Sequence, residues 1–224
     1  MNAPIDHVAR RRPRRHSERT HPALAVRSYS EYTRHLDAGA TTLTIDSGPD
    51  QWLDLGHIPD NIDITITGQT CAAVTGGSIT AAGHCFLQAT HHARVTAYDF
   101  AHVEAFDTTT INAHDSSQIV GTDNADIHAD EHAIVFAHCQ CHVHAAGYAR
   151  IAATDTTTVA IGGDAHVRAS AGVHITGEHQ STNLTIDTRP ISRLADQLNR
   201  SIQLLAPNEI CHPRNRERNP PAFR

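Results

Sequence analysis

An aliphatic residue recurs at every eighth position of this sequence through thirteen consecutive repeats. A small residue stands two positions before each of the first twelve aliphatic residues. Ala or Gly stands two positions after every aliphatic residue except Val159, which is followed there by Ile161. In a strand, residues at spacing two point to the same side, so each repeat predicts a short strand with three inward-facing side chains. An α-helix is excluded, because a period of eight smears these positions around a 3.6-residue turn. The predicted core ladder is Ile79, Leu87, Val95, Val103, Ile111, Ile119, Ile127, Val135, Val143, Ile151, Val159, Val167 and Ile175.

Three residues form the corner between successive strands, and the corner often contains Asp. An Asp at a corner can accept backbone N–H groups and fix the bend. One octad is too short to bury a core, so the octads must stack coil upon coil and share a continuous ladder of strands about 4.8 Å apart. The sequence therefore predicts an all-β fold, an octad-repeat β-solenoid (β-helix) over residues 77–180. The corner acids are Asp99, Asp107, Asp115, Asp123 and Asp155.

The segments on either side of the repeats predict further elements. Residues 1–27 are rich in Arg and Pro and predict a disordered arm. Residues 28–76 predict an N-terminal cap with the first strands, because Ser28 and Glu31 form a capping box for a helix that ends at Gly39. Alternating residues predict strands at 41–45 and 62–66. An apolar stripe over 188–206 predicts a C-terminal amphipathic helix that caps the solenoid or docks a partner, followed by a disordered basic tail at 207–224.

Residues 93–108, ARVTAYDFAHVEAFDT, resemble the octads of bacterial ice nucleation proteins, whose coils contain two octads each. Phrases such as AHVEAFD and SSQIVGTD are also similar to short uncharacterised repetitive proteins of actinobacteria and their phages. The resemblance covers about residues 77–178. It implies sixteen residues per coil and hence roughly six and a half coils. A triangular coil of 24 residues is the alternative.

Composition and charge restrict the core, the compartment and the partners. Apolar residues make up 39% of the chain and aromatic residues 4%, which suits a thin core of small side chains. No apolar run has the length of a signal-peptide core or a membrane span, and five cysteines lack disulfide-scaffold spacing, so we expect a cytoplasmic or virion location without membrane association. The net charge is −6, with acids concentrated in residues 60–180 and Arg in both tails. Basic partners would bind along the body, and nucleic acid only through the tails.

The sequence shows no nucleotide-binding loop, no Ser/His/Asp order and no paired-Cys zinc spacing, so we expect a non-enzymatic protein without a cofactor. A metal site is the alternative. With sixteen residues per coil, Asp126, His128, His142 and His144 stack into one patch that could hold zinc, nickel or copper. The competing interpretation is that His is a polar surface residue in a chain that has nineteen of them. The stacked corner acids also suggest calcium, but one acid per corner favours backbone capping.

Apolar residues on the outward surface predict a contact with a protein partner or another copy. Val120, Ile134 and Phe136 predict an exposed patch on the other face. Tyr98 and Phe106 lie at corners, where the resemblance to ice nucleation proteins implies sideways stacking in a dimer. We therefore expect a rigid rod used as a spacer or docking surface in a phage or bacterial assembly. The alternatives are a module that binds polysaccharide or ice, for which regular aromatic or Thr-x-Thr rows are lacking, and an acidic DNA mimic, which the basic tails disfavour.

Overall fold

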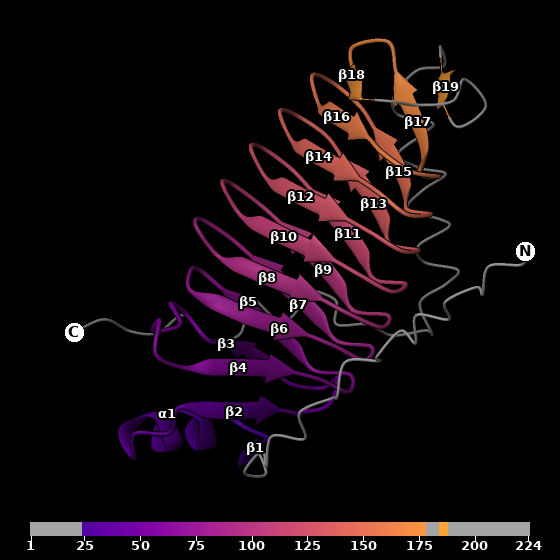
Figure 1. The fold of residues 1–224 in the computed structure, drawn as a ribbon. Helices are drawn as coiled ribbons and strands as arrows, with labels where there is room; N and C mark the ends of the chain where they lie inside the picture. Colours follow the sequence, from indigo (N-terminus) through magenta and orange to yellow (C-terminus); the bar gives the residue numbers. More distant parts are fainter. Residues whose placement is uncertain (1–23, 178–183, 188–224) are drawn as a thin grey trace, which may run out of the picture.

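The chain winds between two parallel β-sheets, and each coil contributes one strand to each sheet (Figure 1). The computed structural model describes residues 24–177 and 184–187. Within these residues, one sheet has ten strands in the order β1-β2-β4-β6-β8-β10-β12-β14-β16-β18, and the other has nine in the order β3-β5-β7-β9-β11-β13-β15-β17-β19. From β2 onward, consecutive strands alternate between the sheets. The fold is the predicted all-β solenoid, with the helix α1 (Tyr29–Asp37) near its N-terminal end.

The ladders run along the whole solenoid. The ten-stranded sheet contains β1 (Leu24–Val26), β2 (Thr42–Ile45), β4 (Asp63–Ile66), β6 (Ser78–Ala81), β8 (Arg94–Ala97), β10 (Thr110–Ala113), β12 (Asp126–Ala129), β14 (His142–Ala145), β16 (Thr158–Ile161) and β18 (His174–Gly177). The nine-stranded sheet contains β3 (Trp52–Asp54), β5 (Cys71–Val74), β7 (Phe86–Ala89), β9 (His102–Ala105), β11 (Gln118–Gly121), β13 (Ile134–Ala137), β15 (Arg150–Ala153), β17 (His166–Ser170) and β19 (Leu184–Asp187). At about 4.8 Å per strand, ten strands span roughly 43 Å.

Each coil of the repeat region contains sixteen residues. Ile111 pairs with Ile127 in the ten-stranded sheet, and Val135 pairs with Ile151 in the nine-stranded sheet. The same register continues to β18, where Val159 pairs with Ile175. The 24-residue alternative is therefore wrong, since a triangular coil would place strands in three sheets. Before the repeats the coils are irregular, because β2 and β4 are 21 residues apart in register and β4 and β6 are 15 apart.

The aliphatic ladder fills the space between the sheets. Its first twelve members are no more than 3% exposed. Ile175 is half-buried instead, because β18 is the last strand of its sheet in the described chain. The Ala residues two positions later, such as Ala97 and Ala113, are fully buried, so the two walls can approach closely. The thin core predicted from the composition is confirmed.

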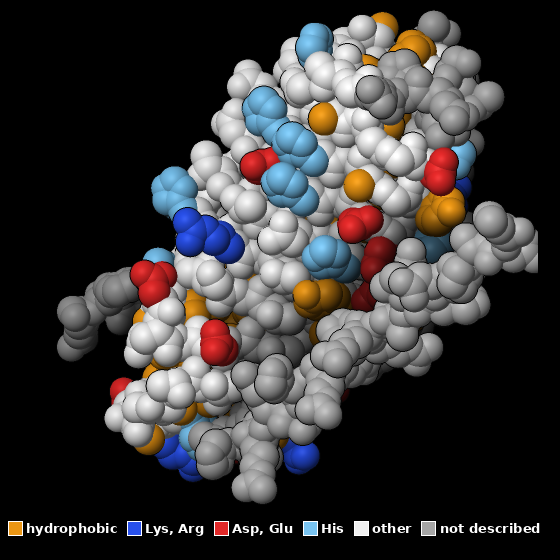
Figure 2. Space-filling model, in the orientation of Figure 1, with side chains coloured by type: hydrophobic (Ala, Val, Ile, Leu, Met, Phe, Trp, Pro, Cys, Tyr) orange, Lys and Arg blue, Asp and Glu red, His pale blue; other side chains and the backbone are white. Residues whose placement is uncertain are grey.

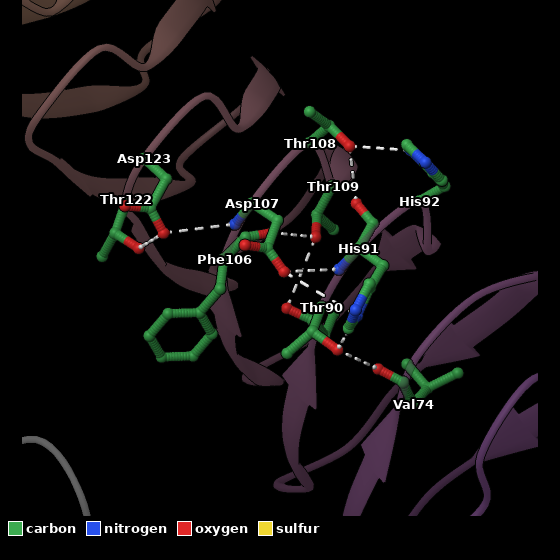
Figure 3. A network of polar contacts seen from close by, with 11 residues as sticks. Val74, Thr90, His91, His92, Phe106, Asp107, Thr108, Thr109, Thr122 and Asp123 are labelled. Atoms are coloured by element: carbon green, nitrogen blue, oxygen red, sulfur yellow. Dashed lines mark hydrogen bonds and ion pairs between the residues drawn. The ribbon is translucent and has the colours of Figure 1, made fainter.

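The corners depend on an unusual backbone conformation and a ladder of side chains. Corner residues such as Asp99, Asp107 and Asp123 have positive φ, a region that Asp tolerates better than most residues. Asp107 Oδ2 accepts a hydrogen bond from the N–H of His91 one coil earlier at 3.0 Å, and Asp123 Oδ2 accepts one from Asp107 N–H at 3.3 Å (Figure 3). The predicted capping role of the corner acids is confirmed. The same contact joins Gly83 to Asp99, Asp99 to Asp115, Asp115 to Glu131 and Cys139 to Asp155.

Helix α1 begins where the sequence predicts. Ser28 is the N-cap, and its hydroxyl accepts a hydrogen bond from Glu31 N–H at 3.3 Å. The Glu31 carboxylate accepts one from Arg27 N–H at 2.8 Å, one residue before the position of an ideal capping box. Tyr32 is buried and donates its hydroxyl to the carbonyl of Leu55, so the helix packs onto the first coils. Within the described chain, no helix is long and apolar enough to cross a membrane.

The predicted N-terminal arm, residues 1–27, is wrong at its C-terminal end. Residues 24–26 form β1, which pairs in parallel with β2 and buries Val26 completely. A strand of three residues is too short to leave a periodic signal in the sequence, and it forms because the edge of β2 offers free hydrogen-bonding groups. Strands β2 to β5 also belong to the two sheets, so the solenoid starts well before residue 77. Residues 1–23, the predicted helix at 188–206 and the tail at 207–224 lie outside the described residues.

Candidate metal and docking surfaces

The outer face of the ten-stranded sheet presents imidazole and carboxylate side chains on its seventh and eighth strands. Strands β12 and β14 supply them, because the alternation that buries Ile127 directs its two neighbours outward. Asp126 pairs with His142 and His128 with His144, as predicted from a sixteen-residue coil. Figure 2 shows histidine side chains gathered beside an acidic side chain on the face in view.

The structure brings three of the four predicted metal ligands together. One potential ligand atom each from Asp126, His128 and His144 lies within 4.8 Å of the other two. His128 Nε2 is 3.8 Å from Asp126 Oδ1, and the two imidazole rings are stacked with centroids 4.7 Å apart and planes 7° apart. His142 is exposed on the same face but is not part of this group, which corrects the predicted set of four.

The carboxylate of Asp126 is used differently from those of the corners. Its Oδ1 is shielded from solvent and has no hydrogen-bond partner among the described residues. By contrast, the corner acids Asp107 and Asp123 each accept a backbone N–H. The side chain as a whole is 46% exposed, and the nearest imidazole nitrogen, Nε2 of His128, is 3.8 Å from Oδ1, so a cation or a protonated imidazole can bind Oδ1 without displacing a hydrogen bond. The Oδ1 of Asp126 therefore makes none of the backbone hydrogen bonds by which the corner acids hold adjacent coils together.

A hollow of about 450 Å³ lies beside the two stacked imidazoles. His114 and Asp130 line it together with His128 and His144. The rest of its surface is small or apolar, from Ala129, Ala145, Ala146, Ala160, Ile161 and Gly162. Small residues at these positions leave room next to the imidazoles for a water molecule or a small ligand.

A second cluster lies at a corner and was not predicted. His138, Cys139 and Asp155 are half-buried, and their ligand atoms lie within 4.8 Å of one another. Cys139 Sγ is 3.3 Å from His138 Nδ1, while Asp155 Oδ2 accepts hydrogen bonds from Cys139 N–H and from the Thr154 hydroxyl. Cys139 occupies a corner position that Asp fills elsewhere, sixteen residues from Asp155. Cys in place of Asp at this corner position was the feature of the sequence that could have predicted the cluster.

We expect the free cysteines to differ sharply in reactivity. Burial raises the pKa of the Cys85 thiol to about 12 and that of the Cys141 thiol to about 11, so neither forms the nucleophilic thiolate at pH 8. Cys139 is only half-buried. Brief treatment of the native protein with iodoacetamide at pH 8, read by peptide mass spectrometry, should label Cys139 and spare the other two. Labelling of Cys85 before denaturant is added would contradict the inward orientation of this position.

The predicted interaction patch is divided between different surfaces. Val120 lies opposite Phe136 on β11 and β13, but Phe136 is only 9% exposed and its ring contacts that of His138. The prediction of an exposed Phe136 is therefore wrong, while Val120 and Ile134 are half-buried. Phe106 follows β9 and Tyr98 follows β8, so they lie at opposite edges of the solenoid. Corners that are eight residues apart lie at opposite edges of the solenoid. Corners that are sixteen residues apart lie at the same edge, one coil apart.

Exposed aromatic rings lie along one edge, formed by the corners that follow strands of the ten-stranded sheet. Tyr98, Phe100 and Tyr148 are 39%, 54% and 56% exposed there. Histidines of neighbouring coils stack against all three, with centroids 5.1 to 5.6 Å apart. We call this surface the aromatic edge and define it by His84, Tyr98, Phe100, His114, His132 and Tyr148.

The threonine rows are interrupted, as predicted. One row contains Thr44, Thr65, Thr80 and Thr96 on four successive strands of the sheet, and then continues as Asn112, His128 and His144. The row two residues earlier has Thr42 but then Asp63, Ser78 and Arg94, so a Thr-x-Thr pair occurs on β2 and is not repeated on the next strands, which gives no support to ice binding.

Comparison of the chain with protein-family models, with curated proteins and with solved structures found no match. The case for function therefore depends on the surfaces of the solenoid itself.

Proposed function

We propose that this protein is a non-enzymatic structural protein, a rigid rod that docks arginine-rich protein segments along its aromatic edge. The basic ends of other copies of the chain are the segments we expect it to bind. The observation that carries the proposal is the location of the exposed rings. Between residues 77 and 177, the exposed large apolar side chains are Tyr98, Phe100 and Tyr148, and all three lie at this edge.

Rigidity follows from the way each coil is held. The coils of the repeat region pair with their neighbours in both sheets, bury the first twelve aliphatic residues of the ladder and form hydrogen bonds between the corners of adjacent coils. Such a rod presents side chains at fixed intervals of about 4.8 Å, and each coil needs only its neighbours for stability. These properties suit a spacer or an extended docking surface.

The aromatic edge combines rings with carboxylates. Asp99 stands between Tyr98 and Phe100, and the exposed acids Asp130 and Glu131 precede His132 in a later corner. Arg guanidinium groups stack on aromatic faces and pair with carboxylates at the same time. Tyrosine and arginine are also the residues that contribute most often to binding energy at protein interfaces. An arginine-rich segment therefore matches both features of the edge.

The chain itself supplies segments of this kind. Seven arginines occur in residues 1–27 and four in residues 207–224, while residues 60–180 contain thirteen acids and three arginines. Opposite charges on the body and the ends favour association between copies. Because the body of the rod is acidic, it favours a basic protein segment as partner and disfavours nucleic acid.

Static light scattering on the untagged full-length chain tests this proposal. We expect a mass above that of one chain at low salt and a decrease as salt screens the charges. Replacing Tyr98, Phe100 and Tyr148 by Ser together should reduce the mass towards that of a single chain at every salt concentration.

The matched control replaces Asn124 and Gln140 by Ser. Both are exposed at the third corner position of the opposite edge, which corresponds to the position of Phe100 and Tyr148. This control should assemble as the wild type does. A wild-type chain that stays monomeric at all salt concentrations, or equal loss of assembly in the two variants, would rule out assembly through the aromatic edge.

A further inference from the structure

We propose that Asp126, His128 and His144 bind one divalent transition-metal ion, and that zinc is the ion best suited to them. Two imidazoles and one carboxylate form a ligand set that zinc uses in proteins. Their ligand atoms already lie within 4.8 Å of one another. This site is independent of the proposed docking function, because none of its three residues belongs to the aromatic edge.

The backbone holds the three side chains in fixed relative positions. Strands β12 and β14 are adjacent interior strands of the ten-stranded sheet, and Ile127 and Val143 anchor them in the core with 0% and 1% exposure. Asp126 and His128 are two residues apart on one strand, and His144 pairs with His128 on the next. Sites on rigid strands need only side-chain rotation to reach a ligand geometry.

The distances are close to those of a bound metal. With zinc–ligand bonds of about 2.0 to 2.1 Å, neighbouring ligand atoms of a tetrahedral site are about 3.3 to 3.4 Å apart. Asp126 Oδ1 and His128 Nε2 are 3.8 Å apart, and the exposed imidazole of His144 is stacked on that of His128. The lone pairs of parallel rings do not converge on one point, so the two exposed imidazoles must rotate out of their stack to occupy two positions of a tetrahedral site beside Asp126.

The carboxylate and the hollow supply the two remaining requirements. Asp126 Oδ1 is shielded from solvent and has no hydrogen-bond partner in the described part of the chain, so a cation would satisfy it. Three protein ligands leave a fourth position for water, as in open zinc sites. The hollow beside His128 and His144 has room for that water.

Isothermal calorimetry with zinc chloride on the untagged, metal-free full-length chain tests the site. We expect one high-affinity zinc per chain. His144→Ala or Asp126→Asn should weaken it by at least about 100-fold, the upper end of the loss expected from removing an outer-shell partner. His142→Ala is the matched control, because it removes an exposed imidazole from the same strand and should leave the affinity unchanged. Circular dichroism should show that all variants stay folded.

Cobalt substitution distinguishes this site from the corner cluster. Cobalt bound by Asp126, His128 and His144 should show no thiolate-to-metal charge-transfer absorption, and Cys139→Ser should not change its affinity. A thiolate band that disappears in Cys139→Ser would move the metal to the corner and overturn the proposal. Unchanged zinc affinity in His144→Ala, equal loss in His142→Ala, or the absence of zinc binding by the wild type would also overturn it.

Discussion

Val135→Asp should abolish cooperative folding of the solenoid. Val135 is 1% exposed and pairs with Ile119 and Ile151 in the middle of the nine-stranded sheet. The carboxylate would enter a core of aliphatic and Ala side chains without a charged partner. An uncompensated buried charge costs several kcal/mol, which is a large part of the 5 to 15 kcal/mol that stabilises a typical domain. We expect a destabilisation above about 4 kcal/mol.

Circular dichroism during thermal unfolding measures this effect, and His142→Ala provides the matched control. His142 is exposed on β14, so its truncation should change the free energy of unfolding by no more than about 0.5 kcal/mol. The reverse order of stability, with His142→Ala unfolded and Val135→Asp intact, would show that the inward and outward positions of the repeat have been exchanged.

Deleting residues 110–125 should shorten the rod by one coil and leave it folded. The deletion removes β10 and β11 and joins Thr109 to Asp126, so β12 pairs directly with β8 and Arg94 lies opposite Asp126. Every later residue keeps its sheet, its face and its edge, because sixteen residues make one coil. The loss should be roughly one nearest-neighbour coil interaction, and the sheet should become about 4.8 Å shorter.

Deleting only residues 110–113 should destabilise the rod more than the longer deletion does. These four residues are strand β10, so the coil at the junction would have twelve residues and no strand between β8 and β12, while the later coils keep their register with one another. We expect a lower midpoint of thermal unfolding for the short deletion than for the long one, both followed by circular dichroism. Equal midpoints for the two deletions would contradict the sixteen-residue coil.

The octad repeat was sufficient to predict the core and much of one candidate site. Aliphatic residues at a strict spacing have one arrangement that buries them all, so the inward position of Val103 or Ile127 followed from the sequence. Stacking at a spacing of sixteen then placed Asp126 beside His142 and His128 beside His144, as the ladder shows. Capping by the corner acids was predictable for the same reason, because a repeated corner repeats its hydrogen bonds.

Features that depend on the angle or the depth of a side chain were not predictable. The periodicity put His142 in the metal group and Phe136 on an exposed surface, but the histidine lies outside the group and the phenylalanine is 9% exposed. Strand β5 was missed because coils of irregular length break the octad pattern. The prediction that Tyr98 and Phe106 belong to one interaction patch is wrong, because corners eight residues apart lie at opposite edges of the solenoid.

The sequence by itself determined the repeating unit of this protein: which side chains face inward, where the corners lie and which residues stack at each coil. These follow from a spacing that only a stacked strand can satisfy, whatever the rest of the chain does. The tertiary structure decided which stacked residues make a site. The distance between Asp126 and His128 and the lack of a hydrogen bond to Asp126 Oδ1 depend on rotamers, and the gathering of exposed rings at one edge depends on the two-sheet cross-section. Periodicity carries no information about either.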